Sequence, residues 1–305
     1  MEFKSFTGLI DIEVGKRLGD GYKVKLDTVQ KNNGIVLTGL TVIQDKNNIS
    51  PTIYLNSYYE RFTKGDVTLD GVVKDVIDTY NRNKVGHAVD MRYFLNYESV
   101  KQKIVYKLIN TERNKELLED VPHMEYMDLS IVFQCLVSQE ELGTASILIH
   151  NVHMKLWDVT VEELFQAAEE NTQKLLPYVI KPMQEVLCEI IQSEDDGEFD
   201  YEQCMEELKD SVPMFVLGNQ SRVDGAACMM YPHLIEDFAN AVDSDLYIIP
   251  SSVHELLLLP TENDTGDAEI KCMIREINDT QVSAEEVLSY SLYYYDREEG
   301  KIVRR

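Results

Sequence analysis

The chain has 305 residues and a formal net charge of −25 at pH 7, because 54 acidic residues outnumber 29 basic ones. This balance excludes a non-specific nucleic-acid binder, which needs a basic surface, and it disfavours docking on anionic lipid. Hydrophobic residues make up 44% of the chain, so a sizeable core is expected, and the length allows one large domain or two ordinary ones.

The cysteines and the chain's hydropathy predict its compartment. The five cysteines are far apart and none forms a CxxC pair: Cys135, Cys188, Cys204, Cys228 and Cys272. This pattern predicts reduced thiols rather than a disulfide framework or a zinc ribbon. Cys135, Cys228 and Cys272 lie in apolar runs, which predicts buried positions. No signal sequence and no apolar stretch of membrane-spanning length is visible, so we predict a cytoplasmic protein.

The N-terminal part of the chain predicts helices around one β-hairpin. Apolar residues at near-helical spacing predict a first helix over 1–18, which the glycines at 19 and 21 end. An Asn-Gly pair at 33–34 joins two strand-like runs, 22–29 and 35–43, which is the strongest short hairpin signal. The remaining elements predicted here are an aromatic-rich helix at 52–63, an amphipathic helix at 69–81 and a strand at 104–109.

The rest of the chain predicts further hairpins, most of them followed by a helix. The predicted hairpins are 127–137 with 144–150, 212–217 with 226–230, 246–249 with 256–259, and 289–295 with 301–304. The predicted helices are 160–176, 183–191, 201–209, 232–241, 268–277 and 282–288. Thr160 and Glu163 have the spacing of a capping box, which fixes the start of the first of these helices.

A hairpin followed by a helix recurs about four times, a pattern that builds mainly antiparallel sheets with helices packed on them. We therefore predict an α+β fold. The boundary between an N-terminal region, 1–120, and a C-terminal region, 121–305, is expected near 115–122.

The segment 245–260, DLYIIPSSVHELLLLP, contains the first candidate site. Two apolar runs predict the buried strands of a central hairpin, and Ser251, Ser252, His254 and Glu255 lie between them. Hydroxyl, imidazole and carboxylate are the ingredients of nucleophilic catalysis. Such triads are normally assembled from distant segments, however, and no GxSxG elbow is present. The spacing therefore favours turn chemistry or ligand binding over catalysis.

Two further polar clusters carry weaker signals. Asn219 and Arg222 lie in a polar loop, where the arginine and nearby backbone amides are able to hold an anion, although plain turn chemistry explains the same residues. His150 and His153 have the spacing of two metal ligands, but no HExxH motif accompanies them. We predict no catalytic residue, no metal site and no cofactor.

Several short segments of the sequence, taken together, resemble an uncharacterised protein family. They are SPTIYLN at 50–56 with the tyrosines at 58 and 59, VEEL at 161–164 with the alanine at 167 and the asparagine at 171, GNQ at 218–220 with GA at 225–226, the segment 245–260, VSAEEV at 282–287 and the tyrosine-rich 290–295. In this order they resemble domain-of-unknown-function family 5688 of gut Firmicutes. More distantly, the VEEL segment with its alanine and asparagine, and the asparagine at 219 with GA at 225–226, resemble a second uncharacterised Bacillus-type family. The resemblance implies a bacterial, cytoplasmic protein and carries no activity, cofactor or catalytic residue.

The functional hypotheses follow from the lack of a clear catalytic motif in the sequence and from the chemistry expected at the surface. The first is a non-enzymatic binding or interaction module for a protein or small-molecule partner, since 17 tyrosines offer recognition surface. The alternative is a hydrolase-like enzyme that uses Ser251 to Glu255, which requires a distant acid or base near His254. A second alternative is an acidic mimic of nucleic acid. The sequence does not fix the oligomeric state.

Overall fold

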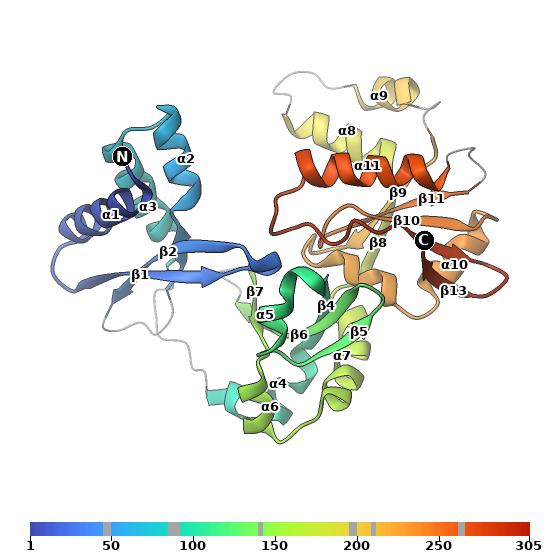
Figure 1. Ribbon diagram of the computed structural model, residues 1–305, viewed down its shortest axis with the longest axis horizontal. Helices are drawn as coiled ribbons and strands as arrows, with labels where there is room; N and C mark the ends of the chain where they lie inside the picture. The colour runs from blue at the N-terminus through green and yellow to red at the C-terminus, as the bar shows by residue number, and fades with distance from the viewer. Residues whose placement is uncertain (45–49, 85–91, 140–142, 195–199, 209–211, 262–265) are drawn as a thin grey trace. The chain divides into compact units, whose positions relative to one another are not determined.

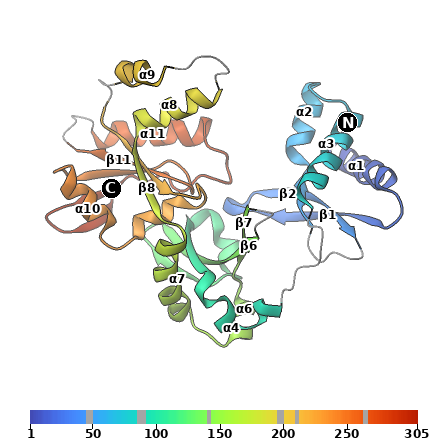
Figure 2. The same ribbon diagram turned by 180° about the vertical axis from the view of Figure 1, so that it is seen from behind.

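The protein divides into two units in the computed structural model (Figures 1 and 2), which describes residues 1–44, 50–84, 92–139, 143–194, 200–208, 212–261 and 266–305. The first unit contains Met1–Leu95 with Ser138–Gly143, and the second contains Asn96–Val137 with Thr144–Arg305. This division differs from the predicted one at residue 120. The reason is that β4 (Ile104–Asn110) pairs along its whole length with β6 (Leu129–Gln139), which places 96–120 with the later residues.

The first unit is a three-stranded antiparallel sheet with three helices. The strands are β1 (Tyr22–Gln30), β2 (Val36–Gln44) and β3 (Thr52–Tyr54), in the order β1-β2-β3. The helices are α1 (Phe3–Leu18), α2 (Asn56–Lys64) and α3 (Leu69–Asn83). The predicted hairpin and the first and third helices are confirmed. The helix predicted at 52–63 is wrong at its start, because Ile53 instead lies opposite Leu40 in the sheet and is buried in the core.

The second unit contains a four-stranded antiparallel sheet. In it β6 pairs with β4, with β5 (His123–Tyr126) and with β7 (Gly143–Leu148). Helix α7 (Val161–Leu175) packs on β4, where the Thr172 hydroxyl accepts the Tyr106 backbone N–H at 3.0 Å. The helix begins with the predicted capping box: the Thr160 hydroxyl accepts the Glu163 N–H, and the Glu163 carboxylate accepts the Thr160 N–H. Short helices connect these elements: α4 (Tyr97–Val100), α5 (Lys115–Leu118) and α6 (Asn151–Trp157).

The same unit contains a six-stranded sheet in the order β13-β12-β10-β11-β9-β8. Its strands are β8 (Tyr178–Pro182), β9 (Phe215–Asn219), β10 (Leu246–Pro250), β11 (Leu256–Pro260), β12 (Tyr293–Asp296) and β13 (Lys301–Arg304). Each strand of this sheet pairs antiparallel with its neighbours. The hairpin of β10 and β11 lies at the centre, and all its residues are buried. The predicted α+β fold and the predicted central hairpin are confirmed.

Helices cover both faces of this sheet. Figure 1 shows α8 (Met183–Glu194) and α11 (Asp267–Thr280) over one face, where Ile270 and Ile274 pack against alternate residues of β10 and β11. On the opposite face, α10 (Leu234–Ala241) places Phe238 against Phe215, with ring centroids 5.0 Å apart. The 3-10 helix η5 (Gly225–Met230) lies beside β9.

Two predictions in this unit are wrong. Residues 226–230 do not form a hairpin strand with 212–217 but the 3-10 helix η5, and β9 pairs instead with β8 and β11. The cause is close packing at Gly225, where an added Cβ would lie 2.3 Å from the His254 backbone oxygen. Residues 282–288 form turns rather than a helix. Strand β8 is not foreseen because prolines flank it, and prolines are poor signals for a strand.

The cysteines correct the prediction of a fully reduced chain. A disulfide joins Cys188 of α8 to Cys204 of α9 (Tyr201–Leu208). Cys135 and Cys228 are buried as predicted, whereas Cys272 is exposed because it lies on the outer face of α11. Among the described residues, no helix combines the length and the apolar character that crossing a bilayer requires.

Candidate functional site

The structure brings together the two segments that contain the predicted binding residues. The loop after β9 lies against the segment between β10 and β11, where the Asp224 N–H donates to His254 Nδ1 at 3.1 Å. The Ala226 N–H donates to the Val253 backbone oxygen at 3.2 Å. Gly225 fits between them because a side chain there would meet backbone atoms. Distant segments therefore form one polar junction.

Both ring nitrogens of His254 face a partner. Because Nδ1 accepts the Asp224 N–H, the ring proton belongs on Nε2, which lies 3.4 Å from a Glu286 carboxylate oxygen. The His254 side chain is 33% exposed. A general base needs a lone pair aimed at the proton that it removes. The only lone pair of this ring is directed at the Asp224 backbone amide.

The serines and Glu255 bond within their own turn. The Ser252 hydroxyl accepts the backbone N–H of His254 at 3.0 Å, and its own N–H donates to the Glu255 backbone oxygen at 3.2 Å. The Ser251 hydroxyl lies 3.5 Å from a Glu255 carboxylate oxygen. No hydroxyl of this segment is hydrogen-bonded to the imidazole, which is the contact that activates a serine nucleophile. These contacts are those of a turn.

Asn219 and Arg222 have different environments. Asn219 is buried: its amide donates to the Val223 backbone oxygen at 2.8 Å and accepts from the Ser221 hydroxyl at 2.8 Å. Arg222 has a side chain that is 84% exposed, and its Nη2 lies 3.7 Å from a Glu189 carboxylate oxygen. Asn219 therefore holds the loop in shape, while Arg222 points outward to α8.

Sequence reasoning missed the residues that complete the junction from the four-stranded sheet. Gln134 Nε2 donates to the Asp224 carboxylate at 2.9 Å, and Lys107 Nζ lies 3.8 Å from the same oxygen. Gln134 is the one amide in the apolar run of β6, and a polar group in such a run needs a buried partner. That signal was available, but the partner, Asp224, is 90 positions away. We call Gln134, Asn219, Asp224, His254 and Glu286 the polar junction.

The two histidines considered as metal ligands instead cap a helix. His150 Nδ1 lies 2.7 Å from an Asp120 carboxylate oxygen, and His153 Nδ1 accepts the His150 backbone N–H at 3.0 Å. Partial burial and the neighbouring His150 lower the pKa of His153. Within the described part of the chain, no three or more His, Cys, Asp or Glu side chains gather in a way that suits a metal ion.

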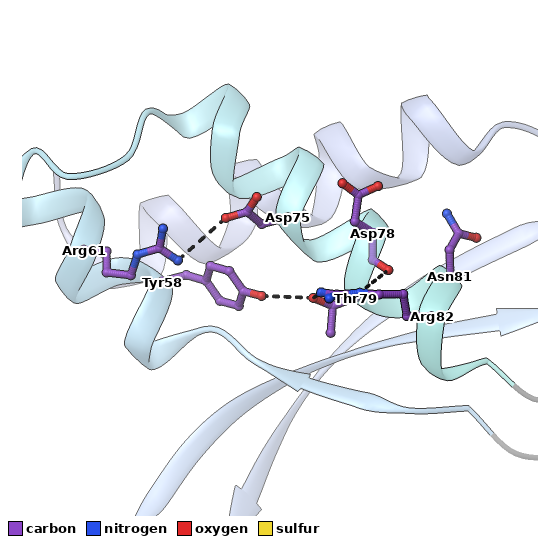
Figure 3. Close-up of a pocket in the computed structure, with 7 residues that line it drawn as sticks. All are labelled: Tyr58, Arg61, Asp75, Asp78, Thr79, Asn81 and Arg82. Atoms are coloured by element: carbon purple, nitrogen blue, oxygen red, sulfur yellow. Dashed lines mark hydrogen bonds and ion pairs between the residues drawn. The ribbon is translucent and has the colours of Figure 1, made fainter. Parts of the chain in front are cut away.

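A cavity of about 600 Å³ lies in the first unit between α2 and α3. Figure 3 shows Arg61 and Tyr58 of α2 directed toward α3, where Arg61 Nη1 lies 3.6 Å from an Asp75 carboxylate oxygen. The Tyr58 and Thr79 hydroxyl oxygens are 3.4 Å apart. The lining contains two arginines and two aspartates: Arg61, Arg82, Asp75 and Asp78. The charges of this lining balance, and Tyr58 is its one aromatic side chain among the described residues, so the cavity is mainly polar.

A second cavity of about 630 Å³ lies in the second unit beside the β12–β13 hairpin, and carboxylates dominate its lining. Asp245 accepts the Tyr294 hydroxyl at 2.6 Å and the Arg297 N–H at 3.0 Å, and these bonds hold the pKa of Asp245 below its usual value. Arg297 Nη2 lies 2.9 Å from an Asp243 carboxylate oxygen. These acids therefore already have donors inside the chain.

A third cavity, of about 440 Å³, lies between β8 and α10 and has a different character. Most of its lining is apolar or aromatic: Pro177, Tyr178, Ile180, Tyr231, Pro232, Leu234 and Phe238, with Gln173 and Asp237 as its polar residues. Tyr178 is 51% exposed, whereas Tyr231 is buried and donates its hydroxyl to the Leu176 backbone oxygen at 2.8 Å. We call this cavity the β8 groove.

The comparisons with known proteins identify the family but no activity. No curated protein and no solved structure matches the chain. A family of unknown function, DUF5688, matches residues 3–297, which is nearly the whole length. The predicted resemblance is therefore confirmed at the level of the family, and the chain belongs to the family of unknown function DUF5688.

Proposed function

We propose that this protein is a non-enzymatic binding module whose ligand occupies the β8 groove. The observation that carries the proposal is the groove itself, which has a volume of about 440 Å³ and is lined largely by apolar and aromatic side chains, with one amide and one carboxylate. Ligand sites combine this kind of apolar lining with a few polar groups that fix orientation. Gln173 and Asp237 supply those groups.

A comparison of the β8 groove with the polar junction supports the groove as the ligand site. The side chains of the junction already bond to partners within the chain, so a ligand there has to replace existing hydrogen bonds rather than add new ones. In the groove, Tyr178 keeps half of its surface in solvent. An exposed tyrosine offers a rigid aromatic face at low cost in side-chain entropy, and tyrosines are enriched among residues that dominate binding energy.

The test is a screen of small aromatic and aliphatic compounds against the whole chain by ligand-observed NMR. We expect aromatic compounds to bind, and we expect Tyr178→Ala to weaken them about tenfold, since a buried aromatic contact is worth 1 kcal/mol or more. Tyr201→Ala on α9 is the matched control, because Tyr201 is also exposed but lies outside the groove. The proposal fails when no compound binds, or when both substitutions weaken binding equally.

The hydrolase hypothesis remains a second candidate because Glu286 meets one of its requirements. A distant acid lies 3.4 Å from His254 Nε2, as that hypothesis demands. Hydrolysis of p-nitrophenyl acetate by the whole chain, abolished by His254→Gln, is its expected result. If the whole chain hydrolyses the ester no faster than that variant does, the hydrolase hypothesis is wrong. The mimicry of nucleic acid remains a prediction, and competition with DNA for a DNA-binding protein tests it.

A cytoplasmic location is part of the proposal, and the disulfide gives it a direct test. Disulfides persist in oxidising compartments and are rare in the cytosol. Differential alkylation in intact host cells, read by mass spectrometry, reports the state of Cys188 and Cys204. Free thiols at both positions support the cytoplasm, and a disulfide in the cells contradicts it.

A further inference from the structure

We infer that the occupant of the β8 groove is an extended, positively charged peptide segment of a partner protein, which adds to the six-stranded sheet as a strand alongside β8. This inference rests on the proposed binding function and specifies the partner. Strand addition to an open sheet edge is a common mode of peptide recognition, in which backbone hydrogen bonds give affinity and side-chain pockets give selectivity.

The first support is the position of β8 in the sheet. It is the last strand of the order β13-β12-β10-β11-β9-β8, and within the described part of the chain it pairs with β9 alone. An edge strand presents a row of N–H and C=O groups that are ready to pair with another chain. The opposite edge, β13, is a short hairpin strand that ends in a run of basic residues, which blunts pairing there.

The second support is the alternating direction of the backbone hydrogen bonds along β8. The Pro177 backbone oxygen accepts from Gln220 at 2.9 Å, and the Met183 N–H donates to the Met214 oxygen at 2.8 Å. These bonds flank the ladder in which Tyr178 lies opposite Asn219 and Pro182 opposite Phe215. In an antiparallel pair the bonding direction alternates along the strand. The N–H and C=O groups of Tyr178 and Ile180 therefore face the open edge.

The third support is that the groove and the open edge share the same two residues. The side chains of Tyr178 and Ile180 line the groove, while their backbone groups face the edge. In a strand added beside β8, every second side chain lies on the groove face next to these two residues. Those side chains are expected to be apolar or aromatic, since the groove wall from α10 presents Leu234 and Phe238.

Charge selects among the possible occupants. Asp237 is the only charged side chain among the described residues that line the groove, and Lys181, on the other face of β8, is paired with Glu189. A net charge of −25 attracts a cationic segment over long range and repels a second copy of the same chain. A basic partner therefore fits better than a homodimer built by pairing two β8 edges.

The test begins with selection of binders from a phage library of random linear dodecapeptides against the whole chain. We expect enriched peptides to be basic, with apolar or aromatic residues at every second position. N-methylation of alternate backbone amides in an enriched peptide is expected to reduce affinity more than tenfold in one register and little in the other. Equal effects in both registers, or apolar residues at helical spacing, overturn the inference.

Variants of the chain separate the edge from the groove. Ile180→Pro removes the N–H that faces the open edge and leaves the bonds to β9, whereas Ile180→Ala removes the side chain but keeps that N–H. We expect peptide binding to fall at least tenfold further with proline than with alanine. Equal losses contradict strand addition.

Charge is tested by Asp237→Lys, with Glu269→Lys as the matched control on α11, outside the groove. Both change the net charge equally, so a greater loss of affinity for the basic peptide with Asp237→Lys supports contact at the groove. Equal losses contradict that contact.

Three outcomes separate the inference from the proposed function. Aromatic compounds that bind through Tyr178, combined with no strand-like peptide, leave the function standing and remove the inference. The absence of any ligand removes both. A dimer in sedimentation velocity that Ile180→Pro dissociates favours a second copy as occupant and overturns the inference.

Discussion

The polar junction and the β8 groove belong to the same unit but use their side chains in opposite ways. In the junction, Gln134, Asp224 and His254 bond to one another across two sheets. In the groove, Tyr178 is half exposed, and its backbone groups lie at an open sheet edge. Residue types that suit catalysis or binding therefore do not by themselves mark a ligand site. A ligand site also needs exposed surface and hydrogen-bonding groups that the fold itself does not use.

The largest loss of stability is expected when the junction is disrupted at Gly225. An alanine Cβ there would lie 2.3 Å from the His254 backbone oxygen and 2.9 Å from the Asn219 backbone nitrogen. Backbone atoms move aside only when their whole segments shift, so we expect Gly225→Ala to lower the free energy of unfolding by about 3 kcal/mol. Urea unfolding measures the change.

Gly266→Ala serves as the control for this substitution. Among the described residues, no atom outside the neighbouring positions lies within 4 Å of the Cβ position at Gly266. Gly266 is the N-cap of α11, where alanine is less favourable than glycine, so the loss there is expected to be about 1 kcal/mol or less. Comparable losses at the two glycines contradict the close packing that joins the loop after β9 to the segment between β10 and β11.

An effect of similar size is expected from Asp224→Ala. The carboxylate accepts from Gln134 in a buried position, and Lys107 lies near it, so its removal leaves a buried amide without its acceptor. Asp224 also has a positive φ of 53°, which alanine tolerates less well than aspartate. Together these terms predict a loss of about 3 kcal/mol in the free energy of unfolding.

Asp243→Ala is a closely matched control. Asp243 also has a positive φ, of 55°, and pairs with Arg297, but its side chain is 89% exposed. It therefore carries the same backbone cost and a surface ion pair, for a loss of about 1 kcal/mol. The difference between the two variants isolates the buried network. Equal losses in calorimetry or urea unfolding show that the junction adds nothing to stability.

The sequence predicted those parts of the fold whose signals are local. The β10–β11 hairpin was predicted because both strands are buried on both faces and appear in the sequence as continuous apolar runs. The start of α7 was predicted from the capping-box spacing of Thr160 and Glu163. Strand β8 was not predicted, because it has only five residues and ends in Pro182. The 3-10 helix η5 was predicted as a hairpin strand at 226–230 because turn-type residues precede it, and only the close approach of the His254 backbone oxygen to Gly225 explains its course.

The candidate site divides in the same way. The sequence named both segments of the junction separately, through Asn219, Arg222, Ser252 and His254, but no local signal says that they meet. Their contact and the link to Gln134 depend on how the two sheets of the second unit pack, over separations of 30 and 90 positions. The β8 groove was invisible for the same reason, since α7, β8 and α10 each contribute one wall.

The smallest loss of stability is expected in the β8 groove, at Tyr178. Tyr178 keeps 51% of its surface exposed, so Tyr178→Ala removes little buried area. At about 25 cal/mol per Å² of apolar surface, and with half of the ring already in water, the loss of unfolding free energy is expected to be about 1 kcal/mol or less. Thermal unfolding of the variant measures it. A residue that contributes so little to stability, yet whose loss removes ligand binding, is one whose exposed surface serves recognition. A loss as large as that of Asp224→Ala would instead assign Tyr178 to the core, and would place the groove beside the junction as part of the folded framework.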